Sequence, residues 1–329
     1  MRFISALLVA GLAGLPLAAQ ERQQPEQTYD RAERAPVTAQ SYMVAAAHPL
    51  AAEVGRDVLA AGGSAADAAV AVQMMLNLVE PQSSGIGGGA FAVYWDASEQ
   101  ALQSLDGRER APLAATPEYW LGEDGEPLKF FQAVVGGRSV GVPGTLKLLD
   151  DLHARHGRLP WPDLLAPAIE TAEQGFEVSP RLAQSIVTAT ALGLTAFPEA
   201  REYFYLPDGT PLPEGALLKN PDFARTLRLI AEARSGPFYH GAIAGDIVAA
   251  VRTEANAGIL TLEDASQHRC NILDLSLTGA AVEVDVVPPV GAPVSLRGML
   301  GRVARHIEGG LSIEFAVTQR REDLKTFLD

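Results

Sequence analysis

A glycine-rich run, Gly85-Ile86-Gly87-Gly88-Gly89, is the first place where this sequence could do chemistry. Backbone without side chains can approach a ligand closely, and its N–H groups can hold an oxyanion or a carboxylate. The letters also satisfy a dinucleotide-binding fingerprint, but that motif needs a strand before the glycines and a helix after them. Here the expected order is helix, glycines, strand, so we reject a dinucleotide site. Two interpretations of the run remain: a loop that binds a ligand around Gly87 and Gly88, or a tight connection between helix and strand. Composition alone favours the tight connection.

Arg108 is the second candidate, in the run Asp106-Gly107-Arg108-Glu109-Arg110 just beyond an expected strand. A guanidinium at a strand end is suited to binding a carboxylate through two hydrogen bonds. A lone arginine in a loop is more often part of a surface ion pair, and the residues alone leave both interpretations open. The sequence contains no recognisable Cys/His pairing, so it does not support a common cysteine hydrolase.

Two helices must position the glycine-rich run. The first is expected over 50–61 and stops at a glycine pair, a common helix end. Ser64 can cap the second helix, 65–79. Asp67, three residues later, can accept a hydrogen bond from the Ser64 N–H in return, as in a capping box. This second helix consists mostly of Ala, Val, Met and Leu, so it is expected to be buried on all sides.

The region around Arg108 is expected to be a strand pair followed by helices, in a mixed α/β fold. Residues 91–95 and 102–105 have strand composition, and a turn follows the second strand. A short apolar segment, 43–47, is a further strand candidate. Helices are expected over 146–156, from a cap at Asp163 to Gly175, and over 179–192, 221–233 and 242–252.

Composition excludes several functions. The formal net charge of −14 disfavours a nucleic-acid partner, because phosphate binding needs clustered Lys and Arg, and it disfavours an anionic membrane surface. The single cysteine, Cys270, excludes an internal disulfide. His153 and His156 are three residues apart, but we interpret them as part of a solvated helix face and expect neither a metal nor a cofactor.

Residues 1–20 have the pattern of a secretory signal peptide. Arg2 gives a positive start, an apolar run follows, and the small residues Ala18-Ala19 suit cleavage. The run is short for a membrane span and is broken by Pro16. We therefore expect a secreted or periplasmic protein without membrane association after cleavage, and a flexible lead-in over 21–41.

The pattern of residues changes at Cys270. Alternating apolar residues and repeated turn signals predict a small all-β segment. We place its limits at 269–329, and we expect a closing helix over 322–328.

Several motifs follow one another in residues 42–268. They include Gly62-Gly63-Ser64-Ala65-Ala66-Asp67, Glu80-Pro81-Gln82-Ser83-Ser84-Gly85-Ile86-Gly87-Gly88-Gly89, Asp106-Gly107-Arg108-Glu109-Arg110-Ala111-Pro112, Val140-Gly141-Val142-Pro143-Gly144 and Gly236-Pro237-Phe238-Tyr239-His240-Gly241. This series resembles the large-subunit part of the γ-glutamyltranspeptidase (glutathione hydrolase) family. The resemblance implies a partial N-terminal nucleophile hydrolase fold with layers in the order αββα, γ-glutamyl transfer or hydrolysis, and substrates such as glutathione. It places Arg108 where the family binds the α-carboxylate of the γ-glutamyl group, with Glu109, Gly87 and Gly88 beside it.

The resemblance also implies a nucleophile that this sequence lacks. Family members cut themselves before a threonine, whose freed α-amino group then activates its own hydroxyl. That threonine opens a Thr-Thr-His-x-Ser-like motif, which is not found between Tyr42 and Asp329; Thr278, followed by glycine, is no substitute. The glycines that stabilise the oxyanion in the family are missing with it. We expect a segment truncated before the nucleophile, with no catalytic residue and no activity alone.

The C-terminal segments 270–280 and 301–306 resemble a PilZ domain, a β-barrel that binds cyclic di-GMP. Asp274, Ser276 and Gly279 match that family's Asp/Asn-x-Ser-x-x-Gly motif, although the same residues also suit a β-turn cap. The Arg-x-x-x-Arg segment that binds the phosphates is missing, so the resemblance implies an incomplete barrel. Two alternatives to the γ-glutamyltranspeptidase interpretation follow: a cyclic di-GMP-binding protein and a non-functional fusion fragment.

Overall fold

The computed structural model of the chain describes residues 36–253, 256–265, 271–275, 278–284, 288–296, 299–307 and 309–316. The chain divides into two compact units, 1–41 and 42–329, and every helix and strand below lies in the second. The expected signal peptide, the lead-in up to residue 35, Cys270, Ser276 and the expected closing helix lie outside the described residues.

Helices α1 (Pro49–Ala60) and α2 (Ala65–Val79) begin and end within one residue of their predicted positions. The predicted capping box is confirmed. The Ser64 hydroxyl accepts a hydrogen bond from the Asp67 N–H at 3.1 Å, and the Asp67 carboxylate accepts one from the Ser64 N–H at 2.7 Å. Most of α2 is buried, as predicted, because α1, α4 and α5 pack around it and its alanines allow close approach.

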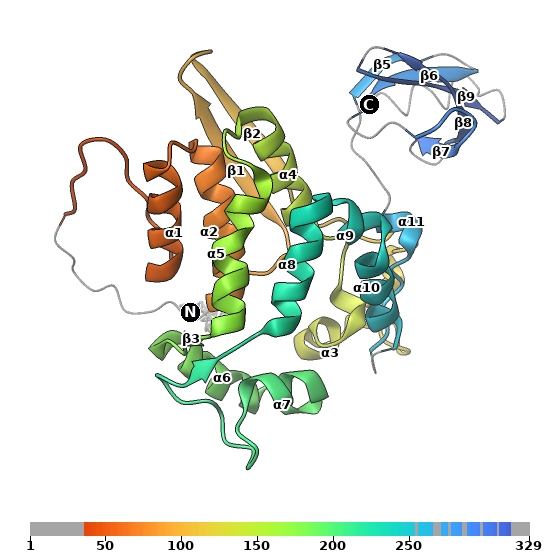
Figure 1. Ribbon diagram of the computed structural model, residues 1–329. Helices are drawn as coiled ribbons and strands as arrows, with labels where there is room; N and C mark the ends of the chain where they lie inside the picture. The colour runs from red at the N-terminus through yellow and green to blue at the C-terminus, as the bar shows by residue number, and fades with distance from the viewer. Residues whose placement is uncertain are drawn as a thin grey trace, which may run out of the picture. The chain divides into compact units, whose positions relative to one another are not determined.

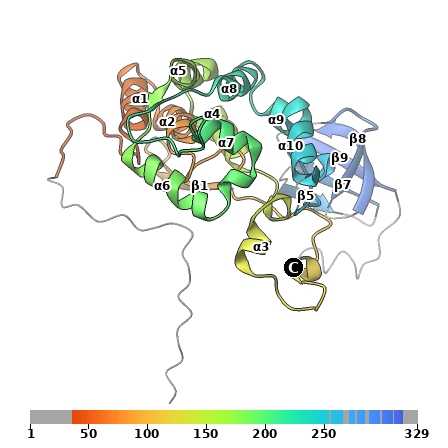
Figure 2. The same ribbon diagram turned by 90° about the horizontal axis from the view of Figure 1, so that it is seen from below.

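A row of helices, α1, α2, α5 (Trp161–Gln174) and α8 (Pro221–Ala233), forms a packed layer (Figures 1 and 2). Each helix of the row contacts the next, and Met74, Leu165 and Ile230 are fully buried between them. No helix in the described part of the chain combines the length and apolar character needed to cross a bilayer.

Residues 36–265 contain further helices and short strands besides this layer and the hairpin described below. They are η1 (Pro117–Trp120), α3 (Phe130–Val134), η2 (Gly137–Ser139), α4 (Thr145–His156), β3 (Phe176–Glu177), α6 (Pro180–Ala191), η3 (Leu194–Ala196), α7 (Pro198–Phe204), β4 (Leu217–Leu218), α9 (Gly236–His240), α10 (Ala242–Thr253) and α11 (Leu262–Ala265). The predicted cap at Asp163 is wrong, because α5 already begins at Trp161 with a proline in its first turn, a favoured place for proline. The strand predicted at 43–47 is not formed, since no described strand pairs with it.

Strands β1 (Ala90–Asp96) and β2 (Ala101–Gly107) form an antiparallel hairpin. One face packs on α4 and includes the buried Leu105. The other face exposes Phe91, Val93, Trp95 and Leu102, which are 65, 71, 54 and 67% exposed; we call these four residues the exposed hairpin face. The described strands of residues 36–265 form only two-stranded sheets, so this part of the chain does not build the predicted αββα layers by itself.

The C-terminal residues form an all-β sheet, as predicted. Its strands are β5 (Asn271–Leu275), β6 (Gly279–Glu283), β7 (Pro293–Leu296), β8 (Met299–Ile307) and β9 (Gly310–Phe315), all antiparallel in the order β5-β6-β9-β8-β7. The hydrophobic cluster of this sheet shares no residue with the cluster of the helical part. The sheet is open rather than a barrel, because no pairing between described residues joins the edge strands β5 and β7.

Candidate functional site

Three backbone segments, 85–89, 107–110 and 141–145, meet at one end of the hairpin, and we call them the glycine–arginine site. The Gly144 N–H donates to the Gly88 carbonyl at 2.9 Å, and the next N–H along the chain donates to the same oxygen at 3.1 Å. The turn that enters α4 therefore holds the glycine loop in place.

The same turn also holds the end of β2. Arg110 and Val142 exchange two backbone hydrogen bonds of 3.2 and 2.8 Å. A Cβ atom added to Gly144 would lie 2.1 Å from the Gly107 carbonyl oxygen, a distance that no side chain permits. The glycine at position 144 is required because the strand end and the helix entry are in direct backbone contact.

Arg108 lies directly after β2, and its side chain is 69% exposed. Its Nε forms an ion pair with the Glu109 carboxylate at 2.9 Å. Because Nε makes this contact, the terminal amino groups can still meet a planar carboxylate from solvent. The Glu109 carboxylate lies against Gly89, where an added Cβ would be 2.4 Å from Oε2. The surface ion pair and the carboxylate-binding role, which the sequence left as alternatives, are thus compatible.

The two predicted glycines occupy different places in the site. An added Cβ at Gly88 would lie 3.6 Å from Glu109 Oε1, whereas Gly87 is exposed and an added Cβ there would meet nothing within 4 Å. Among the described residues, the N–H groups of Gly87 and Gly89 have no hydrogen-bond acceptor, so they can serve an anionic ligand. The structure therefore brings Gly88, Glu109 and Arg108 together, with Gly87 exposed at the edge of the loop.

A buried acidic residue, Glu80, anchors the chain just before the glycine loop. Its side chain is 3% exposed, and its carboxylate accepts hydrogen bonds from Arg181 at 2.9 Å and from Gln82 at 2.7 Å. Arg181 also donates to the Ser83 hydroxyl at 2.9 Å. Burial raises the pKa of Glu80, while Arg181 and the Gln82 hydrogen bond act in the opposite direction. The sequence does not reveal this pair, because its members are 101 residues apart and no local pattern links them.

A second set of hydrogen bonds ties the loop to α2. The Ser84 hydroxyl donates to Asn77 Oδ1 at 2.8 Å, and Gln73 Nε2 donates to that oxygen at 2.8 Å and to the Ser84 hydroxyl at 2.6 Å. Gln73 and Asn77 face the same side of α2, since they are four residues apart. Side chains of α2 and α6 thus fix the entrance of the glycine loop.

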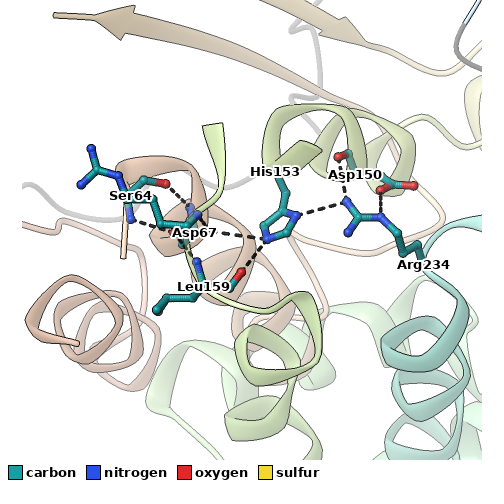
Figure 3. A network of polar contacts seen from close by, with 7 residues as sticks. Ser64, Asp67, Asp150, His153, Leu159 and Arg234 are labelled. Carbon is teal, nitrogen blue, oxygen red and sulfur yellow. Dashed lines mark hydrogen bonds and ion pairs between the residues drawn. The ribbon is translucent and has the colours of Figure 1, made fainter. Parts of the chain in front are cut away.

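A buried polar network surrounds Asp67 (Figure 3). Asp67 is fully buried, and beyond its helix cap it accepts hydrogen bonds from the N–H groups of Arg158 at 2.9 Å and Leu159 at 3.3 Å. His153 Nε2 lies 3.0 Å from the Leu159 carbonyl and 3.6 Å from Asp67. The prediction that His153 lies on a solvated face is wrong: its side chain is 11% exposed, because these partners supply its hydrogen bonds inside the fold.

Arg234 completes the network (Figure 3). Its Nη2 lies 3.1 Å from His153 Nδ1. A guanidinium can only donate, so Nδ1 accepts, Nε2 carries the proton and the imidazole is neutral. Arg234 also donates to Asp150 at 2.5 Å and lies over the Trp161 ring at 4.7 Å, and these contacts hold it at a φ of 55°, a strained value for a residue other than glycine. Both ring nitrogens of His153 are engaged, so this network supports packing rather than catalysis.

His156 is likewise enclosed rather than solvated, with a side chain 11% exposed. Its ring stacks on Tyr94 with centroids 4.1 Å apart, and its Nε2 lies 3.0 Å from the Gln103 amide oxygen. Both partners belong to the hairpin, which the sequence pattern of α4 alone does not reveal. His156 therefore attaches α4 to the strands that end at the glycine–arginine site.

The predicted cyclic di-GMP motif is only partly described. Asp274 lies on β5 and Gly279 begins β6, whereas Ser276 lies outside the described residues. Gly279 packs closely on β9, where an added Cβ would be 2.3 Å from the Ile313 carbonyl oxygen. The sheet itself therefore accounts for this glycine, and a ligand role for the motif stays a prediction.

The chain is similar to known sequences, and it matches the family model described as Gamma-glutamyltranspeptidase over residues 51–295. It is 43% identical over 242 residues to the glutathione hydrolase proenzyme of Bacillus subtilis (strain 168), a match that covers 73% of this chain and 40% of that protein. It is 35% identical over 266 residues to glutathione hydrolase 3 of Arabidopsis thaliana, covering 78% of this chain and 39% of that protein. The chain thus spans about 40% of the length of these curated relatives.

Comparison with solved structures gives the same family. The γ-glutamyltranspeptidase of Helicobacter pylori matches with a TM-score of 0.67 and 30% identity, over 82% of this chain and 71% of that chain. The enzyme from Pseudomonas nitroreducens, complexed with L-DON, matches with a TM-score of 0.64 and 32% identity, over 82% and 72%. These matches confirm the predicted mixed α/β fold class of N-terminal nucleophile hydrolases. The resemblance of the C-terminal segment to a PilZ domain gains no support.

Proposed function

Because the chain belongs to the γ-glutamyltranspeptidase family, we propose that it binds γ-glutamyl compounds such as glutathione for γ-glutamyl hydrolysis or transfer. The observation that carries this proposal is the glycine–arginine site. There an exposed arginine, oriented by a neighbouring carboxylate, stands beside a loop of glycines. This arrangement suits the α-carboxylate that every γ-glutamyl group presents.

Arg108 holds the substrate in this proposal. A guanidinium matches a carboxylate through two parallel hydrogen bonds, which fixes orientation as well as position. Glu109 orients the guanidinium through Nε at 2.9 Å and leaves the terminal amino groups for the ligand. The N–H groups of Gly87 and Gly89 add neutral donors from the adjacent loop.

Bond cleavage needs groups that we do not find in the sequence. Attack on a γ-glutamyl amide requires an activated hydroxyl and hydrogen-bond donors for the oxyanion. No Thr-Thr-His-x-Ser-like motif occurs in the 329 residues. We propose that these residues bind substrate but do not cleave it by themselves. Incubation with a chromogenic γ-glutamyl anilide should then release no amine, and release that Arg108→Ala abolishes would contradict the proposal.

The exposed hairpin face suggests how the fold is completed. A contiguous group of large apolar side chains in solvent marks an interface. We propose that a segment carrying a second sheet and the nucleophile covers this face and completes the αββα layers. Support comes from the Bacillus subtilis relative, which is named a proenzyme and of whose length this chain matches only 40%.

Calorimetric titration with glutathione tests the role of Arg108. We expect Arg108→Ala to weaken binding by roughly tenfold to a hundredfold, because hydrogen bonds to charged groups contribute about 1.5–3 kcal/mol. Arg108→Lys keeps the charge but loses the planar fork, so its affinity should lie between those of the other two proteins.

Arg225→Ala is the matched control for this titration. Arg225 also forms an exposed ion pair, with Asp222 at 2.8 Å, and it belongs to α8 rather than to the site. Its removal should leave the affinity unchanged. If Arg108→Ala binds glutathione as tightly as the unaltered chain, the proposed carboxylate site is refuted.

A further inference from the structure

Tyr239 makes two hydrogen bonds to the turn that enters α4. It lies on α9 and is 7% exposed. Its hydroxyl donates to the Pro143 carbonyl at 3.0 Å and accepts from the Lys147 N–H at 3.2 Å. A single side chain thus bridges the residues on either side of the helix start.

Helix α4 needs partners of this kind because it has no side-chain cap of its own. Its N-cap residue is Gly144, which has no side chain that could accept a hydrogen bond from the first turn. The first N–H groups of a helix have no acceptor within the helix. Here the Thr145 N–H donates to the Gly88 carbonyl and the Lys147 N–H donates to Tyr239. The Gly88 carbonyl and the Tyr239 hydroxyl therefore cap the N-terminus of α4 together.

The capped turn is in direct contact with the substrate-binding residues. A Cβ added to Gly144 would lie 2.1 Å from the Gly107 carbonyl oxygen and 2.9 Å from that of Arg108. Backbone at this separation has no free space, so a shift of the turn must displace Arg108. The same shift would break the hydrogen bonds to Gly88.

Helix α9 is itself fastened to α4 at a second point. Asp150 of α4 accepts hydrogen bonds from Arg234 and from the Ser235 hydroxyl, directly before α9 begins. Tyr239 is therefore held firmly enough to define where its hydroxyl lies. Burial raises the pKa of Tyr239 above the ordinary value of a tyrosine, so the hydroxyl keeps the proton that it donates to Pro143.

We infer that Tyr239 is a positioning residue for the glycine–arginine site, holding the turn at 143–147 where it fixes Gly88 and Arg108. What the site binds rests on the proposed function; the positioning itself rests only on these contacts.

Tyr239→Phe removes the hydroxyl and nothing else, and Tyr205→Phe is the matched control. Tyr205 is also 7% exposed and its hydroxyl is also engaged, with Thr190 at 2.6 Å, but it lies outside the site. Hydrogen exchange is measured on the full chain, followed by titration with glutathione. We expect Tyr239→Phe to speed amide exchange in 85–89 and 144–147 by about tenfold and to weaken glutathione binding by about threefold to tenfold. Tyr205→Phe should change neither.

Unchanged exchange in 85–89 and 144–147 in the Tyr239→Phe protein, or an equal change in the Tyr205→Phe protein, would overturn the inference. If Tyr239→Phe does not fold, Ser235→Ala, which releases one contact of α9 with Asp150, should give the same pattern at smaller amplitude. No change there overturns the inference as well. Failure of the unaltered chain to bind glutathione refutes the proposed function instead, while the exchange pattern still decides the role of Tyr239.

Discussion

Buried charged residues in this chain are compensated by partners at short distance. Asp67 is fully buried, and its carboxylate is bound by backbone N–H groups from two segments. Glu80 is almost fully buried and is paired with Arg181. Removing one member of such a pair leaves an uncompensated charge, which costs roughly 3–5 kcal/mol. These residues explain why the chain before the glycine loop has a defined position although the loop itself is rich in glycine.

His48 is expected to make stability depend on pH. It caps α1, with Nδ1 accepting from the Leu50 N–H at 3.2 Å, and it is 9% exposed. Burial lowers the pKa of His48 below 6.5, with Glu53 acting in the opposite direction. A histidine whose pKa is lower in the folded than in the unfolded protein favours folding above its unfolded pKa. That contribution is lost as the pH falls below 6.5 towards the folded value.

Thermal unfolding followed by circular dichroism at a series of pH values checks this expectation. The melting temperature should fall as the pH is lowered through about 6.5. His48→Asn keeps a cap acceptor but does not titrate, so part of this fall should disappear. Identical pH dependence in both proteins would show that His48 is not responsible.

At the scale of elements, α4 is the piece on which the site is built. His156 attaches it to the hairpin, Asp150 and Tyr239 attach it to α9, and its first N–H groups hold the glycine loop. The hairpin positions Arg108, which directly follows the last residue of β2. The hairpin itself is incompletely packed, because its second face is in solvent.

The exposed hairpin face should bind the part of a relative that this chain does not match. The test mixes the chain with the portion of the Bacillus subtilis protein outside the matched 40% and follows complex formation by sedimentation velocity. Val93→Lys places a charge on the face and should weaken the complex at least about tenfold, since an unpaired charge at a buried contact is costly. Val187→Lys on α6, where the valine is 52% exposed, is the control and should have no effect. Equal binding of both variants would argue against this interface.

At the scale of the whole molecule, the described residues form separate hydrophobic clusters. The larger cluster belongs to the helices and the hairpin, a smaller one lies within the sheet β5–β9, and a third consists of Val142, Val251 and Leu260. Because each cluster is stabilised by its own contacts, we expect the two parts to unfold as separate cooperative units.

Matched leucine substitutions test this independence. Leu227 is fully buried in the larger cluster, and Leu311 is 3% exposed in the smaller one. Replacing either with alanine should cost its own unit about 2–5 kcal/mol. Scanning calorimetry should show two transitions, with Leu227→Ala lowering one and Leu311→Ala the other. A single transition lowered by both changes would mean that the parts unfold together.

The limits of the longer helices and of the two hairpin strands were predictable from the sequence, because they depend on neighbouring residues. The Ser64–Asp67 capping box begins α2 where the sequence predicts, strand composition predicts the hairpin, and alternating apolar residues predict the all-β C-terminal segment. The candidate role of Arg108 was also accessible, since it depends on one contiguous motif and on a resemblance carried by that motif.

Which side chains meet across the fold became apparent only in three dimensions. Glu80 with Arg181, His153 with Arg234, and Tyr239 with Pro143 join residues between 81 and 101 positions apart. No local pattern encodes such contacts, because they depend on which helix faces pack together. The same reason explains why histidines on α4 looked solvated in the sequence, and why the open edge of the C-terminal sheet and the uncovered face of the hairpin were visible only once the strands had been placed.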